Sequence, residues 1–79
     1  MTIKDGARLS DIAVGEACRV VRIYTEGGMR RRFYDIGLIP GAEVFCMGAS
    51  PLGDPRAYLI RGKLIAIRAA DARGIEVDI

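Results

Sequence analysis

The 79-residue sequence contains no histidine, tryptophan, asparagine or glutamine. Without histidine, the chain lacks the side chain that serves most often as a general acid or base, and its serines have no imidazole to activate them. The chain also has no Gly-x-x-x-x-Gly-Lys-Ser/Thr phosphate loop. We therefore expect a protein that is not an enzyme, with no catalytic residues and no bound cofactor.

Cysteine is scarce, and long apolar runs are missing. Cys18 and Cys46 stand far apart in the sequence and do not form a Cys-x-x-Cys motif, so we expect buried, reduced thiols. A disulfide would form only if the fold brings them close. Residues 1–15 hold no apolar signal-peptide core, and no run is long enough to cross a bilayer. The sequence thus predicts a cytoplasmic protein without membrane insertion.

The net charge is small, at +2, with a pI of about 8.8. This value falls short of the basic character typical of a dedicated nucleic-acid-binding domain. Ten of the twelve basic residues are arginine, which binds carboxylates and phosphates bidentately. Arginine usage therefore favours protein or phosphate recognition, although a lineage bias in codon usage would explain it equally well.

Alternating apolar residues predict about five short strands in one domain, residues 1–79. Residues 1–8 are polar, and we expect them to be loosely ordered. We expect Leu9 and Ile12 to close the bottom of a barrel through a turn that Ser10 starts. Strand 17–24 carries apolar residues on both faces, which predicts that both faces are covered. Later strands are expected at 43–49, on both arms of a hairpin over 56–68, and at 75–79; a single helical turn is expected at 69–74.

A short helix is predicted after the first strand, because Met29, Phe33 and Ile36 share one face. Gly37 is suited to the left-handed residue that follows a helix, and we expect Leu38 to contact Phe33 in a Schellman cap. A type II turn is expected over residues 39–42. In the hairpin, either Leu59 or the pair Tyr58 and Ile60 faces inward. These elements predict a small all-β barrel with one short α-helix.

The order and spacing of several motifs resemble those of the FeoA family (ferrous iron transport protein A). The matching segments are Leu9-Ser10-Asp11, Gly27-Gly28 through Gly41, Pro51 to Pro55, and Ile67-Arg68 through Val77. The resemblance covers roughly residues 9–77. Phe33 stands where the family usually has an aliphatic residue, and Ile67 where leucine is common; both positions remain apolar.

The resemblance implies an SH3-like β-barrel of about five strands and a cytoplasmic role in bacterial ferrous iron uptake. It also implies a partner, the membrane permease FeoB, which carries a cytosolic GTPase domain. The contact surface, the oligomeric state and the direction of any effect on GTP hydrolysis are not implied. Ferrous iron favours histidine and carboxylate ligands. Because the chain has no histidine and its carboxylates show no ligand spacing, we expect no metal site.

Two segments are candidate partner-binding sites. The first is the exposed half of the predicted helix, where Arg30, Arg31 and Tyr34 combine residue types enriched at interface hot spots. The run Arg30–Arg32 would alternatively be a solvated charged face, or would supply an arginine finger to a GTPase. The second is the loop segment SPLGDPRAY, from which we select Leu52 and Arg56. Leu52 either projects from the loop for a partner or folds back onto the barrel.

Two other classes of function stay open. Small barrels often bind RNA, but the three tyrosines are widely spaced and do not predict a stacking platform, so we expect no nucleic-acid partner. A regulatory module like the SH3-like domain of iron-dependent repressors also resembles this chain. The sequence shows no helix-turn-helix, which argues against a stand-alone repressor.

Overall fold

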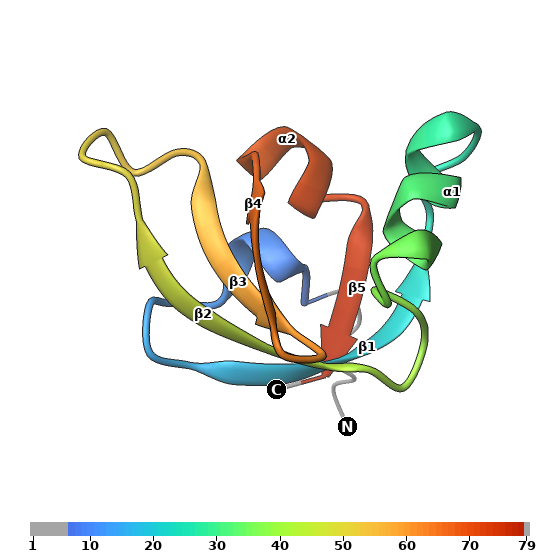
Figure 1. Ribbon diagram of the computed structural model, residues 1–79, viewed down its shortest axis with the longest axis horizontal. Helices are drawn as coiled ribbons and strands as arrows, with labels where there is room; N and C mark the ends of the chain where they lie inside the picture. Colours follow the sequence, from blue (N-terminus) through green and yellow to red (C-terminus); the bar gives the residue numbers. More distant parts are fainter. Residues whose placement is uncertain (1–6, 79) are drawn as a thin grey trace, which may run out of the picture.

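Five antiparallel strands form one strongly curved sheet in the computed structural model, which describes residues 7–78 (Figure 1). The strands are β1 (Ala17–Ile23), β2 (Glu43–Ala49), β3 (Arg56–Ile60), β4 (Lys63–Ile67) and β5 (Ile75–Asp78). Their order is β4-β3-β2-β1-β5, so the first strand pairs with both the second and the last. Three short helices complete the fold: a 3-10 turn η1 (Leu9–Asp11), α1 (Gly28–Asp35) and α2 (Ala69–Ala72). The predicted mainly β architecture, with one short helix after the first strand, is confirmed.

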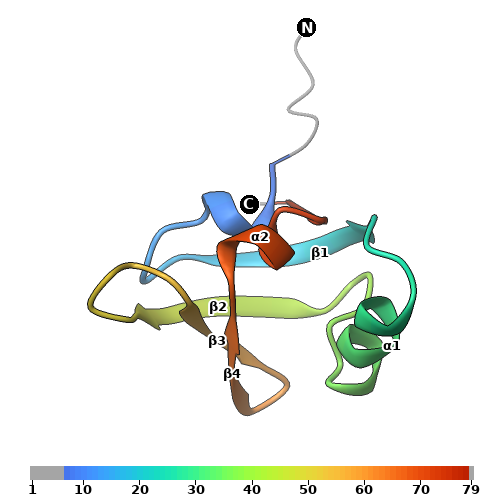
Figure 2. The ribbon, with the colours of Figure 1, turned by 90° about the horizontal axis from the view of Figure 1, so that it is seen from above.

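The core lies inside the curve of the sheet, where η1 and α2 lie side by side over its open side (Figures 1 and 2). Leu9 and Ile12 are fully buried there, as predicted. The start of the η1 turn was predicted wrongly, because Arg8, not Ser10, is its N-cap residue. The Arg8 backbone N–H donates to the Asp11 carboxylate at 2.8 Å, and this bond stabilises the start of the turn in place of one from Ser10.

A bulge in β1 overturns the simple alternation expected for residues 17–24. Cys18 and Val20 face the core, and the next buried residue is Ile23. Val20 pairs with Val77 and Arg22 with Glu76, so the pairing to β5 leaves Val21 as the extra residue. Val21 is consequently 40% exposed, and the prediction that both faces of this strand are covered was wrong.

The exit of α1 is the Schellman cap that the sequence predicts. The Leu38 N–H donates to the Phe33 carbonyl at 2.8 Å, and the Gly37 N–H donates to the Tyr34 carbonyl at 3.1 Å. Gly37 has φ of +91°, and Phe33 and Leu38 are both buried. The following turn closes with an Ala42 N–H to Ile39 carbonyl bond of 3.0 Å, as expected for residues 39–42.

The second half of the sheet is a tight hairpin. Ile60 pairs with Lys63, so the turn is the two residues Arg61 and Gly62, both with positive φ. Tyr58 and Ile60 face the core, which decides between the two alternatives left open for this arm, since Leu59 is 36% exposed.

The ends of the described chain differ in part from expectation. The Val77 N–H donates to the Ala7 carbonyl at 2.8 Å, and Arg8 forms a β-bridge with Glu76. The prediction that residues 1–8 are loosely ordered is therefore wrong for Ala7 and Arg8; residues 1–6 lie outside the described part. Likewise the predicted last strand, 75–79, is observed up to Asp78, and residue 79 lies outside the described part.

Cys18 and Cys46 are buried free thiols, as expected. Both face the core from neighbouring strands, and Cys18 pairs with Val44, two residues from Cys46. Burial raises the pKa of the Cys18 thiol to about 11, and the nearby Cys46 and Glu16 add to the increase. The thiol therefore stays protonated at neutral pH and is a poor nucleophile.

We predict that Gly37→Ala lowers the free energy of unfolding by about 1–2 kcal/mol, because a Cβ atom disfavours this left-handed conformation. The added Cβ would also collide with the Arg61 side chain. Urea denaturation measures the loss. Gly28→Ala is the matched control, since its Cβ would meet no atom within 4 Å and its φ is not positive. Equal stability of the two variants would contradict the cap.

Stability should also fall in alkali because of Cys18. The unfolded thiol releases its proton near pH 9.0, whereas the native thiol keeps it until about pH 11. The stabilisation is thus complete below pH 9 and is lost as the pH rises towards 11. Denaturation curves of wild type and Cys18→Ala across this range measure the effect, and the decline should be shallower in the variant. Parallel declines would refute the assignment.

Candidate interaction surface

Helix α1 presents its predicted arginine–tyrosine half to solvent. Arg30, Arg31 and Tyr34 are all exposed, while Phe33 packs into the core. One Arg30 Nη donates to the Tyr34 hydroxyl at 3.2 Å, and the guanidinium lies 5.1 Å from the centre of the Tyr34 ring. The structure therefore brings together the three helical residues that were selected from the sequence.

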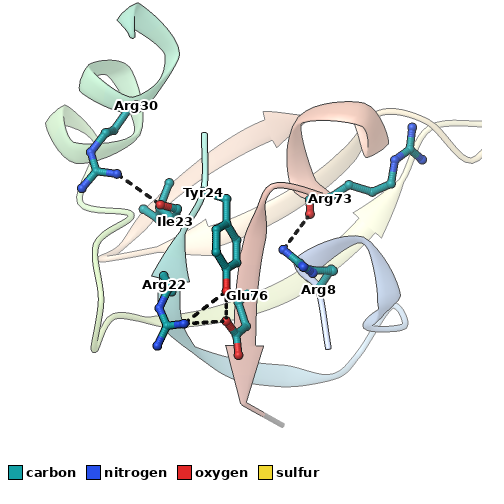
Figure 3. Close-up of polar contacts among 7 residues, drawn as sticks. All are labelled: Arg8, Arg22, Ile23, Tyr24, Arg30, Arg73 and Glu76. Carbon is teal, nitrogen blue, oxygen red and sulfur yellow. Dashed lines mark hydrogen bonds and ion pairs between the residues drawn. The ribbon is translucent and has the colours of Figure 1, made fainter. Parts of the chain in front are cut away.

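Arg30 also ties the helix to the sheet. Its second Nη donates to the Ile23 carbonyl at the end of β1, at 3.1 Å (Figure 3). This bond fixes the orientation of the helix beside β1 and limits the freedom of the Arg30 side chain. Arg31 makes no ion pair with Asp35 within residues 7–78, so its guanidinium stays available for a partner.

A second arginine–tyrosine cluster lies below the helix, at the junction of β1 and β5 (Figure 3). The Tyr24 hydroxyl donates to the Glu76 carboxylate at 2.9 Å and accepts from Arg22 at 3.2 Å. Arg22 is also 3.7 Å from the Glu76 carboxylate. The guanidiniums of Arg8 and Arg22 lie 4.7 and 5.8 Å from the centre of the Tyr24 ring. One tyrosine is thus held between two cations.

The cluster is built by strand pairing. The bulge at Val21 places Arg22 opposite Glu76, and the bridge from Arg8 to Glu76 brings a second arginine to the other side of β5. The Arg8 guanidinium also donates to the Arg73 carbonyl at 3.4 Å. The hydrogen bond to Tyr24, and then the charges of Tyr24 and Glu76, raise the pKa of Arg22 above its usual value.

The combined surface carries four arginines, Arg8, Arg22, Arg30 and Arg31. Of these, Arg22 forms an ion pair with Glu76, and the Arg8 backbone N–H donates to the Asp11 carboxylate. We call the two clusters together the arginine–tyrosine surface: Arg8, Arg22, Tyr24, Arg30, Arg31 and Tyr34. Guanidiniums held in place by tyrosine rings lose less conformational entropy when they bind a carboxylate or phosphate. The surface is therefore prepared for an acidic partner.

The other candidates lie elsewhere. The loop of residues 50–55 joins β2 to β3 on the side of the molecule opposite α1 (Figure 1). Leu52 at its tip is 93% exposed, so it does not fold back onto the barrel. The same loop has a structural role, because the Asp54 carboxylate accepts the Ala69 N–H at the start of α2 at 2.8 Å. Arg56 is half-buried and donates to the Ile12 carbonyl, so its side chain is directed to the interior of the fold.

The cluster around Tyr24 was missed from the sequence. Each member has an ordinary position in a strand or turn, and only the pairing of β1 with β5 brings them together. The available signal was the alternation of Glu76 with the apolar Ile75 and Val77 in the last strand, but the partner of this strand could not be identified from the sequence.

Two properties of the described residues bear on function. Within residues 7–78, no group of three or more histidine, cysteine, aspartate or glutamate side chains gathers as a metal site. No helix in the same range has the length and apolar character needed to cross a bilayer.

Comparison with known proteins identifies the family. The FeoA domain model matches residues 7–79. The chain belongs to the FeoA family. A curated relative from Porphyromonas gingivalis, an Fe(2+) transport protein A/Fe(2+) transporter FeoB fusion protein, is 32% identical over 72 residues. The match covers 91% of this chain and 8% of the relative, so this FeoA chain corresponds to a small part of that fusion.

Solved structures agree with the SH3-like fold. The NMR structure of FeoA from Chlorobium tepidum is 36% identical, with a TM-score of 0.87, covering 92% of this chain and 70% of that one. FeoA of Stenotrophomonas maltophilia, described as an SH3 domain protein and crystallised with zinc, is 22% identical with a TM-score of 0.80. That match covers 91% of this chain and 89% of the S. maltophilia chain. IdeR of T. acidophilum shares only the fold, at 22% identity and a TM-score of 0.82, covering 100% of this chain and 36% of that one.

We predict that Tyr24→Phe lowers the free energy of unfolding by about 0.5–1.5 kcal/mol, because it removes the hydroxyl between Arg22 and Glu76. The ring and its contacts with both arginines remain. Tyr34→Phe is the control, since its hydroxyl accepts only from Arg30 on the exposed helix, and we expect a smaller loss. A thermal melt that ranks Tyr34→Phe as the more damaging variant would contradict the network.

Proposed function

We propose that this FeoA chain is a cytoplasmic, non-enzymatic accessory protein of bacterial ferrous iron uptake, and that it docks on the FeoB-type permease. The observation that carries the proposal is the fusion of the two components in the P. gingivalis relative. Fusion places an FeoA domain permanently beside a permease, which raises its effective concentration at any docking site. The same proximity favours a contact between this FeoA domain and a permease of that type.

The arginine–tyrosine surface is the contact that the geometry supports best. It combines exposed arginines with two tyrosines, the residue types that dominate interface hot spots. Its charge would suit an acidic patch on a partner, because charge complementarity speeds encounter. Leu52 on the opposite side of the barrel would serve a different contact. Arg56 donates to the Ile12 carbonyl, so its guanidinium is less available for contact with a partner.

Nucleic-acid binding is less well supported. Stacking of bases requires free aromatic faces. In the described chain both tyrosines of the arginine–tyrosine surface already have guanidiniums near their rings, at 4.7 Å for Tyr24 and 5.1 Å for Tyr34. Tyr58, the third tyrosine, is buried. Competition between bases and these arginines disfavours a stacking role.

Calorimetric titration of the protein with the isolated cytosolic domain of the permease, bound to GDP or to a GTP analogue, tests the proposal. Arg31→Glu should weaken the interaction about tenfold, because it reverses an exposed, unpaired charge at the interface. Arg68→Glu is the control: it makes the same charge change on an exposed residue before α2.

Equal affinity of Arg31→Glu and wild type would exclude the helix face. Equal weakening by both variants would mean that only the net charge matters. A difference between the two nucleotide states would identify FeoA as a regulator of the GTPase cycle. Absence of binding in both states would contradict docking on the cytosolic domain.

A further inference from the structure

A second unusual surface lies on the outer face of the sheet, where apolar residues form a row across four strands. Ala17 pairs with Phe45, Phe45 with Leu59, and Leu59 with Leu64. Paired residues lie on the same face of a sheet, so these four side chains are continuous from β1 to β4. We call them the outer row: Ala17, Phe45, Leu59 and Leu64.

Nothing in residues 7–78 covers this row. The helices lie over the concave side of the sheet or beside it (Figure 1), and Leu64 is 62% exposed and Leu59 36% exposed. The adjacent position, Met47, is 48% exposed, and Ala57 pairs with Ala66 next to the row. A polar outer face is the usual arrangement when one side of an antiparallel sheet meets water. A contiguous apolar face of this kind is typical of a binding surface.

Three residues of the row, Ala17, Phe45 and Leu59, line a shallow hollow of about 640 Å³. Its rim is charged. Arg19 is paired there with Glu43 at 3.4 Å, and it also donates to the Gly41 carbonyl at 3.1 Å. Arg61 stands at the other end of the rim and makes no ion pair within the described residues. Since Arg19 and Glu43 neutralise each other, the unbalanced charge at the rim is the cation of Arg61.

The backbone at Arg61 gives a second reason to consider this residue. Its φ is +51° in the hairpin turn, a position where asparagine, aspartate or glycine is strongly preferred. Arg61 is the only non-glycine residue with positive φ within the described chain. Its side chain passes close to Gly37, whose missing Cβ leaves room for it. Strained positions of this kind cluster at functional sites.

We infer that the outer row is a second binding surface, for a protein segment with a large apolar side chain next to acidic residues. The apolar side chain lies in the hollow against Phe45 and Leu59. A carboxylate beside it binds the guanidinium of Arg61, which supplies charge-assisted hydrogen bonds. This surface lies on the sheet and does not share a residue with the arginine–tyrosine surface, so it does not depend on docking to the permease.

The test uses the full chain, labelled with ¹⁵N, and two N-acetylated, C-amidated peptides. The first has the sequence EDLFDE and the second KRLFRK, so both share the apolar centre and differ in charge. In heteronuclear correlation spectra, the acidic peptide should shift the amides of Phe45, Leu59 and Leu64. Its affinity should exceed that of the basic peptide by about tenfold or more, because like charges repel at the rim.

Arg61→Gly separates the site from the fold, because glycine adopts the turn conformation more easily and the variant should remain folded. It should lower the affinity for the acidic peptide about fivefold or more, since one charge-assisted contact is lost. Arg31→Gln removes one charge from α1 as the control and should leave the affinity unchanged.

Four outcomes would overturn the proposal: shifts confined to α1, equal affinity for the two peptides, no effect of Arg61→Gly, or no shifts at millimolar peptide. Shifts of the outer row that depend on protein concentration in the absence of peptide would assign the face to a second copy of this chain, and would also overturn it.

Discussion

The pairing of β1 with two strands at once is the interaction on which the rest of the structure depends. β1 lies between β2 and β5, and the bulge at Val21 changes which of its side chains face inward. Before the bulge, Cys18 and Val20 enter the core; after it, Ile23 does. The same shift places Arg22 opposite Glu76 and leaves the Ile23 carbonyl free to accept from Arg30. One inserted residue thus closes the core and builds the arginine–tyrosine surface.

Two kinds of surface result from this arrangement, and their physics differs. The arginine–tyrosine surface is polar and is held by internal hydrogen bonds, so charge and the orientation of guanidiniums would govern the binding proposed there. The outer row is apolar, with its charge at one end at Arg61, so burial of a side chain would govern the binding proposed there. A domain of this size has only a small solvent-exposed surface. Carrying two such surfaces on one barrel is consistent with a module that contacts more than one segment.

Much of the local structure could be predicted from residue type. The Schellman cap was predicted because glycine at residue 37 adopts positive φ easily and proline at residue 40 cannot continue a helix. The hairpin over 56–68 was predicted because Arg61-Gly62-Lys63 stands between two apolar runs; the structure narrows its turn to Arg61 and Gly62, since Lys63 already pairs with Ile60. The start of η1 was predicted wrongly, because the side chain that caps it belongs to Asp11, the last residue of the turn, which accepts from the Arg8 N–H. Leu52 was ambiguous because a loop residue packs or projects according to contacts that are distant in sequence.

The sequence by itself determined the burial pattern outside β1, the turns after α1 and the family, since these depend on neighbours within a few residues and on motif order. Only the tertiary structure decided the partners of each strand, and with them every group of side chains that forms a surface. Tyr24 and Glu76 are 52 residues apart in the sequence. Phe45, Leu59 and Leu64 belong to three separate strands. Cross-strand register, fixed by backbone hydrogen bonds and by the β1 bulge, brings such residues together. A single sequence contains no direct record of that register.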